Sequence, residues 1–236
     1  MPLINNEGMK ILDRLFLQII QRNLTEEAMQ WLKAKVSLIK KEDKSIQLNL
    51  CFSHLPRFAS KKIIDLSQTE LNEIMDLLPG FSIEGWTIDR LCRVWLLMQI
   101  PDQDKEQYLK KINGLFAAAE MNEQIALYSA LPFYTYPEEW IAKTEEGIRS
   151  NIGTVLEAIM YYNPYPAYYL SENAWNQLVL KAFFTEKNVN YIVGLHKRSN
   201  ERLTETLNDY VEERTAAHRT VNPEIYKLIE QQNQKI

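Results

Sequence analysis

The sequence predicts an all-α fold of about eleven short helices in antiparallel pairs, arranged as a curved α-α superhelix or α-solenoid-like layer. Apolar residues recur at every third or fourth position along most of the chain. Proline-marked turns separate these segments, and seven glycines are too few for the many tight turns of an all-β protein. We therefore expect more than about 60% helix, against roughly one third in an average globular protein.

Three helices are predicted in the amino-terminal part of the chain. The first runs from Glu7 to Arg22, and Thr25 is a good N-cap for the second, whose apolar residues repeat at helical spacing up to Ile39. The segment from Ile46 to Phe52 alternates between apolar and polar residues, which is typical of a strand. We nevertheless predict a helix there, ended by Pro56, because a single strand would have no partner.

The next segment contains the helix predicted to lie at the centre of the fold. A capping box at Ser67-Gln68-Thr69-Glu70 begins one helix, and Pro79-Gly80 ends it. Thr87 can cap the following helix, in which few positions before Pro101 are polar. A helix that is apolar nearly all round is predicted to be buried, so this one should be central.

Helices continue to alternate with proline-marked turns after this point. Asp102 and Asp104 open one helix, and Pro132 ends the next. The linker at residues 133–136 is short and aromatic, so we expect it to pack against the protein. A further helix begins at Pro137. The helix after it is predicted from one apolar stripe, formed by Ile148, Ile152, Val155, Leu156 and Ile159.

The last part of the chain is organised around Asn163-Pro164-Tyr165-Pro166. Two prolines so close together cannot lie in a helix interior, so the preceding helix must stop there. Ser171 can cap the next helix, which extends to about Phe184. Ser199 is expected to cap a long helix, and Pro223 to open a short final one. We interpret residues 1–236 as a single helical domain, with a soft subdivision near 101–104 or 132–137.

The charge of the chain is modest overall but uneven. The formal net charge is −4, which does not predict a nucleic-acid-binding protein. Basic residues exceed acidic ones by five in residues 1–62, and acidic residues exceed basic ones by nine in residues 63–148. Such blocks are usually solvated helix faces and less often a docking surface.

The sequence is typical of a cytoplasmic protein. Cys51 and Cys92 lie in apolar surroundings and are expected to be reduced, buried and structural. Lys10, Asp13 and Arg14 interrupt the first apolar segment, so it does not resemble a secretion signal. No run reaches the roughly 18 apolar residues that a transmembrane helix needs.

No motif in the sequence indicates a reaction. The three histidines, at positions 54, 196 and 218, lie far apart and outside any metal-ligand spacing. Glu120 and Glu123 have no Glu-x-x-His partner that a di-iron site would require. The nucleophile elbow, the phosphate-binding loop and the Cys-x-x-Cys motif are all missing. We therefore expect no metal and no cofactor, and we favour a protein that is not an enzyme.

Polar residues beside apolar stripes are the better functional candidates, because buried polar groups must be paired. One interpretation is an internal brace in which Arg149, Glu157, Asn176 and Lys181 meet across the Asn163–Pro166 bend. The other is the polar floor of an aromatic pocket lined by Tyr161, Tyr165, Tyr168 and Trp175. The ligand- or partner-binding candidates are Arg57, Trp86, Asp89, Arg149, Asn151, Glu157, Asn163, Tyr165, Trp175, Asn176, Lys181 and Arg219.

Several of these residues belong to stretches that resemble one known family, in one collinear order from about Phe52 to Tyr226. The most specific are Asn163-Pro164-Tyr165-Pro166 and the run from Trp175 to Ala182. The others are Phe52–Arg57, Pro79-Gly80-Phe81 with Gly85-Trp86, Glu123–Leu131, Glu146–Asn151, Glu157-Ala158, Gly194-Leu195, Arg198 with Asn200, Glu213-Arg214, and Arg219 with Pro223. Together they resemble the EboA family.

This resemblance implies a cellular context more than a chemistry. Members are encoded in a small operon linked to moving a secondary-metabolite precursor from the cytoplasm towards the periplasm. The neighbouring products resemble a membrane prenyltransferase, a metal-dependent hydrolase, a sugar-phosphate cyclase and an isomerase. The expected function is thus a non-catalytic scaffold or adaptor that works with these proteins. The alternative is a binding protein or enzyme with a pocket for an aromatic or isoprenoid molecule at the Asn163–Pro166 bend.

Overall fold

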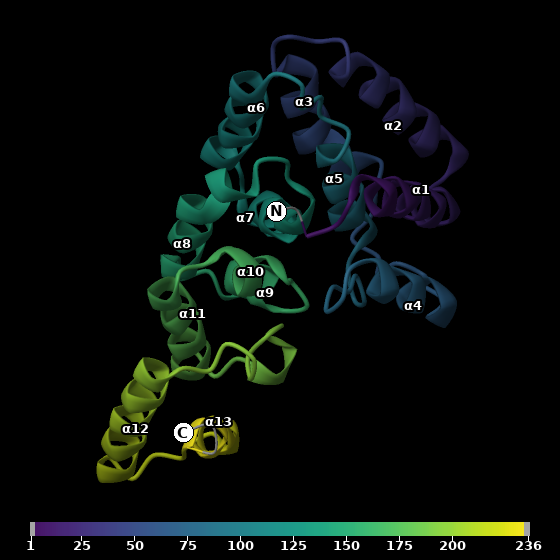
Figure 1. Ribbon diagram of the computed structural model, residues 1–236. Helices are drawn as coiled ribbons and strands as arrows, with labels where there is room; N and C mark the ends of the chain where they lie inside the picture. The colour runs from purple at the N-terminus through teal and green to yellow at the C-terminus, as the bar shows by residue number, and fades with distance from the viewer. Residues whose placement is uncertain (1–2, 234–236) are drawn as a thin grey trace.

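The computed structural model describes residues 3–233, and these residues form thirteen α-helices and four short 3-10 helices without a strand (Figure 1). Helices make up 69% of the protein, which confirms the predicted all-α fold. Two isolated β-bridges, Ile63 with Thr87 and Tyr161 with Ile192, are the only strand-like pairings in the described residues. The elements are α1 Asn6–Asn23, α2 Glu26–Ile39, α3 Ile46–His54, η1 Leu55–Arg57, α4 Gln68–Leu77, α5 Ile88–Leu97, α6 Lys105–Ala118, α7 Met121–Ser129, η2 Leu131–Phe133, η3 Pro137–Trp140, α8 Ile141–Arg149, α9 Gly153–Met160, α10 Tyr165–Tyr169, α11 Glu172–Phe184, η4 Val189–Tyr191, α12 Glu201–Ala216 and α13 Pro223–Asn233.

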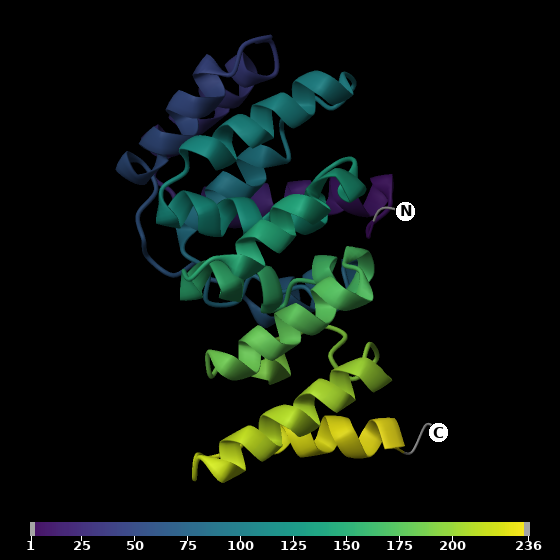
Figure 2. The same ribbon diagram turned by 90° about the vertical axis from the view of Figure 1, so that its left-hand side faces the viewer.

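The helices stack in layers along one axis (Figures 1 and 2). Helices α2 and α3 lie at one end of the stack, and α12 and α13 lie side by side at the other. Between them, α5 packs against α1 and α7, α7 packs against α9, and α8 packs against both α9 and α11. The superhelical path and the antiparallel pairing of the helices stay predictions.

Helix α5 has the central position that its composition predicts. Nine of its residues are buried, and they include the charged side chains of Asp89 and Arg93. These two form an ion pair of 2.8 Å one helical turn apart, with side-chain exposures of 5% and 2%. Burying a single charge there would cost far more free energy than burying the pair, so each residue compensates the charge of the other.

Residues 46–52 are helical, as predicted, despite their alternating pattern. Leu48, Cys51 and Phe52 are buried, and their spacing of three and four residues is the one that α3 turns towards the core. The Glu42 carboxylate accepts hydrogen bonds from the backbone N–H groups of Gln47 and Leu48. It therefore satisfies two donors of the first turn, which have no partner within the helix.

Four predicted caps are confirmed, the cap predicted at Ser199 is wrong, and Thr87 lies at the N-cap of α5 without making a capping hydrogen bond. The side chains of Thr25, Ser67, Asp104 and Ser171 each accept a hydrogen bond from the first turn of the helix that follows. Helix α12 is capped instead by Asn200, whose Oδ1 accepts from Leu203 N at 2.9 Å, and not by Ser199. An asparagine at the N-cap makes the same bond as a serine, so Asn200 takes the role that was predicted for Ser199.

The helix predicted from the stripe Ile148–Ile159 is two helices. Ser150 adopts an extended conformation and ends α8, and the Ser150 hydroxyl accepts a hydrogen bond from Ile152 N before α9 begins. Gly147 lets the neighbouring helices approach closely, since a Cβ there would lie 2.6 Å from both Ile159 Cδ1 and Tyr128 Cζ. The apolar residues thus face one core from two helices, which a single stripe in the sequence cannot reveal.

Two further expectations concern the core and the membrane. Cys51 and Cys92 are buried and free, as predicted. Across residues 3–233, none of the helices combines the length and the apolar character needed to cross a membrane.

Candidate functional site

The Asn163–Pro166 bend is a packed joint between helices. The Asn163 amide donates to the carbonyls of Tyr128 and Ala158, and its Oδ1 accepts from Tyr165 N. The Tyr165 side chain is fully buried and donates its hydroxyl to the Pro137 carbonyl. Pro164 and Pro166 lie at the start of the short helix α10, where a missing N–H leaves no bond unmade. This part of the molecule therefore holds α7, η3, α9 and α10 together.

A second joint connects α11 to the turn before α12. The Arg198 guanidinium lies 4.8 Å from the centre of the Trp175 ring and donates to the backbone carbonyls of Pro166 and Ala167. Asn176 and Asn200 exchange hydrogen bonds of 2.9 and 3.1 Å through their amides. The two predicted candidates in this joint, Trp175 and Asn176, thus contact other parts of the chain.

The predicted network of Arg149, Glu157, Asn176 and Lys181 is wrong. Arg149 is exposed and lies 4.0 Å from Glu145, one turn earlier on its own helix. Lys181 donates to the Ser150 carbonyl at 2.6 Å. Glu157 pairs with Lys187, and Asn176 pairs with Asn200. The four residues therefore have four different partners and form no common network.

The aromatic pocket predicted at the bend is also wrong. Trp175, like Tyr165, has no exposed surface, whereas Tyr168 is 67% exposed and the Tyr161 hydroxyl accepts from Asn188 N. Three other candidates are exposed on separate elements: Arg57, Asn151 and Arg219. The remaining two, Trp86 and Asp89, lie on either side of the start of α5.

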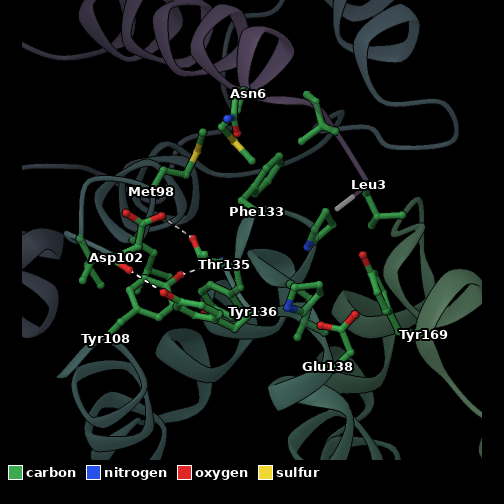
Figure 3. Close-up of a pocket in the computed structure, with 18 residues that line it drawn as sticks. Leu3, Asn6, Met98, Asp102, Tyr108, Phe133, Thr135, Tyr136, Glu138 and Tyr169 are labelled. Atoms are coloured by element: carbon green, nitrogen blue, oxygen red, sulfur yellow. Dashed lines mark hydrogen bonds between the residues drawn. The ribbon is translucent and has the colours of Figure 1, made fainter. Parts of the chain in front are cut away.

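The structure forms a cavity elsewhere, which we call the aromatic cavity (Figure 3). It measures about 440 Å³, within the range of small-molecule sites. The segment before α1 forms one wall, the end of α5 a second, and the chain from η2 to η3 a third, with Tyr169 of α10 closing one side. Its lining residues are Leu3, Ile4, Asn6, Met9, Leu97, Met98, Ile100, Asp102, Tyr108, Leu131–Glu138 and Tyr169.

A hydrogen-bonded cluster forms the polar side of the aromatic cavity. The Thr135 hydroxyl donates to Asp102 Oδ2 at 3.0 Å, and the Tyr136 hydroxyl donates to the Asp102 carbonyl at 2.8 Å. Thr135 N donates to the Tyr108 hydroxyl, and Trp140 Nε1 donates to the Thr135 carbonyl. These hydrogen bonds hold the polar side chains in place before any ligand binds, as a preorganised binding site requires.

Tyr136 has an unusual backbone conformation in this cluster. Its φ of 58° lies in the left-handed region, which costs a residue with a side chain about 1–2 kcal/mol. The surroundings hold it there, because its hydroxyl bonds to Asp102 and its ring packs edge-on against Tyr108. Strained residues of this kind often occur at ligand sites, where neighbouring contacts determine their position.

The charged residues that line the aromatic cavity are all acidic. Asp102 and Glu138 contribute carboxylates, and none of its lining residues in the described chain is Lys, Arg or His. Burial raises the pKa of the Tyr108 hydroxyl, and burial together with the Glu138 charge raises the pKa of Tyr169. Both tyrosines are therefore protonated at neutral pH. The cavity offers hydroxyl groups, carboxylates and aromatic rings, which suits neutral or cationic molecules and disfavours anions.

Sequence reasoning missed the aromatic cavity, although part of its signal was visible. The linker at residues 133–136 was expected to pack because it is aromatic, and it forms one wall. The other walls come from residues near 3–9 and 97–102, which lie far away in the sequence. Only the fold brings these segments together.

The fold and the aromatic cavity define the chain as a layered all-α protein with a cavity of small-molecule size among its packed helices. Residues 12–230 match the family described as "Metabolite traffic protein EboA". The chain belongs to the EboA family. No curated protein and no solved structure gave a significant match. Within residues 3–233, no group of three or more His, Cys, Asp or Glu side chains could hold a metal ion.

Proposed function

We propose that this protein acts in metabolite traffic as a non-catalytic scaffold that holds a small aromatic molecule, neutral or cationic, in the aromatic cavity. The cavity is the observation that carries the proposal. Its volume of about 440 Å³ suits a small metabolite, and tyrosine and phenylalanine rings supply apolar contact at several of its walls. The tyrosine hydroxyls and the Asp102–Thr135 pair can orient a hydroxyl or amine group of the ligand.

The scaffold part of the proposal is supported by what the other polar candidates do. Asn163, Asn176 and Lys181 make hydrogen bonds to the protein itself, and Trp175 lies beneath Arg198. These residues hold successive helix layers together. A rigid layered stack can present a bound molecule and several helix faces to partner proteins at the same time.

The cellular setting of the proposal comes from the family. The name of the family suggests metabolite traffic. We infer that the protein works in the cytoplasm with other products of its operon, among them a membrane protein that resembles prenyltransferases. In this setting it would pass a precursor of a secondary metabolite towards the periplasm.

Three probes that share one ring and differ in charge test the cavity. Benzyl alcohol is neutral, benzylamine is cationic and benzoate is anionic at neutral pH. Isothermal titration calorimetry with the purified protein should detect benzyl alcohol and benzylamine but not benzoate, because the Asp102 carboxylate repels an anion and no Lys, Arg or His is among the described lining residues. Binding of benzoate as tight as that of benzyl alcohol would contradict the proposal.

A pair of methionine variants shows whether binding occurs in this cavity. Met98 lines it, so Met98→Trp should fill part of the space and abolish binding of the neutral probe. Met121 is half exposed on α7 and lines no part of the cavity, so Met121→Trp should bind as the wild type does. Equal loss in both variants, or in neither, would contradict the assignment of the site.

A further inference from the structure

A second cavity lies beside the start of α5, and its chemistry is opposite to that of the aromatic cavity. It measures about 170 Å³ and shares no lining residue with the aromatic cavity. We call it the Arg90 pocket. Its lining residues are Lys61, Gly85, Thr87, Asp89, Arg90, Asn122 and Ile125.

Arg90 is held so that one edge of its guanidinium is used and the other is not. Its Nε donates to Ser129 Oγ at 2.9 Å, and its plane lies over the Trp86 ring at 4.1 Å from the ring centre. Neither terminal nitrogen makes a hydrogen bond or an ion pair to the described part of the chain. Burial lowers the pKa of this guanidinium, because removing the charged group from water costs free energy.

The neighbouring side chains add donors around the same space. Lys61 brings an ammonium group from the segment before α4, and Asn122 brings an amide from the first turn of α7. Thr87 contributes a hydroxyl, which makes no hydrogen bond to the helix that it precedes. A cavity of this size with two cations, an amide and a hydroxyl matches the donors that bind phosphate oxygens.

Asp89 is the single carboxylate among the lining residues of the Arg90 pocket, and its charge is already shared. Its Oδ2 accepts from Arg93 Nη1 at 2.8 Å. Its Oδ1 is buried and has no hydrogen-bond partner. A buried acceptor without a donor is costly, and a hydroxyl group of a ligand would satisfy it.

We propose that the Arg90 pocket binds a phosphate group that carries or neighbours a hydroxyl, with Arg90 and Lys61 holding the charged oxygens and Asp89 accepting from the hydroxyl. Inorganic phosphate fits this description, because its monoanion and dianion each keep a P–OH group. A phosphomonoester with an adjacent hydroxyl, such as glycerol 3-phosphate, fits it as well. Sulfate has no proton at neutral pH, so it cannot satisfy Asp89.

The test is calorimetric titration of the full chain with inorganic phosphate, glycerol 3-phosphate and sulfate at low ionic strength. We expect phosphate to bind and sulfate to bind at least about tenfold more weakly, as the loss of one charge-assisted hydrogen bond implies. Tighter binding of glycerol 3-phosphate would identify a phosphomonoester, and binding of phosphate alone would identify the free ion. Either result supports the proposal, whereas it is overturned if neither phosphate nor glycerol 3-phosphate binds. Sulfate binding as tight as phosphate overturns the role of Asp89.

Surface variants locate the binding without disturbing the core. Lys61 and Asn122 are exposed, so Lys61→Ala and Asn122→Asp should leave the fold intact. Each should weaken phosphate binding by about tenfold, the first by removing a cation and the second by adding a negative charge. Lys62 is exposed next to Lys61 and lines no part of the pocket, so Lys62→Ala should change binding less than about twofold. Equal effects in Lys61→Ala and Lys62→Ala would overturn the proposal.

Discussion

The buried ion pair between Asp89 and Arg93 provides the sharpest test of the fold. The Arg93 side chain is only 2% exposed. Replacing Asp89 with alanine therefore leaves its guanidinium buried without a neighbouring anion. Within residues 3–233, its only other hydrogen bond is from Nε to the Phe52 carbonyl at 3.2 Å. A single carbonyl cannot compensate a full charge, so the variant should lose stability.

The expected loss follows from the geometry of the pair. Removing one partner of a buried ion pair costs about 3–5 kcal/mol, because the remaining charge is uncompensated. The bond to Phe52 remains, which places the expectation near the lower end, at about 3 kcal/mol. The double variant Asp89→Ala with Arg93→Met removes both charges and fills the site with an apolar side chain. It should therefore recover most of the lost stability.

Urea unfolding at pH 7, followed by circular dichroism, measures these free energies. The exposed pair of Glu145 and Arg149 is the matched control, because its atoms lie 4.0 Å apart and Arg149 is 63% exposed. Glu145→Ala should cost less than about 0.5 kcal/mol. A loss below about 1 kcal/mol in Asp89→Ala, or a double variant less stable than the single one, would refute the reasoning.

Three more expectations concern other charged and titratable groups. The Glu70 pKa is lowered to about 2, chiefly by its hydrogen bond from Arg22. The stability that this bond contributes is present above the ordinary glutamate pKa and is lost as the pH falls towards about 2. The free energy of unfolding of Glu70→Gln should therefore differ from that of the wild type at pH 7 but not at pH 2. Burial raises the pKa of Cys51 to about 12 and raises that of Cys92, so a thiol reagent should label the native protein far more slowly than the urea-unfolded one. Glu157→Ala should cost less than about 1 kcal/mol by urea unfolding, because Glu157 is 36% exposed; a loss of several kcal/mol would show that its lysine partner is effectively buried.

The helical architecture was predictable because its signals are local. Helical spacing of apolar residues, N-caps such as Ser67 and Ser171, and proline-marked turns each act within a few residues of where they occur. Errors arose where two local signals were close to equivalent. Ser199 and Asn200 can both cap a helix, and the stripe around Ser150 fits one helix as well as it fits two.

The polar partners were not predictable, because a pairing depends on the direction of each side chain across the whole fold. Lys181 and Glu157 were expected to meet, yet each bonds to a group that is closer in space, at Ser150 and Lys187. Arg93 was not singled out in the sequence, although it is the most deeply buried arginine in the described chain. An arginine in an otherwise apolar helix, with an acidic residue one turn before it, could have indicated a buried ion pair.

Charge counted along the sequence also gives a poor guide to charge in space. Residues 1–62 are basic and residues 63–148 are acidic, which was interpreted as solvated helix faces or, less often, a docking surface. Lys61 belongs to the first block and Arg90 to the second, and they line the same pocket. At physiological salt, charges more than about 8 Å apart are largely screened, so the nearest groups decide which ions bind. The proposed phosphate at Arg90 would meet two cations and the already paired Asp89 within an acidic segment of the chain, whereas the aromatic cavity has no cation among its described lining residues.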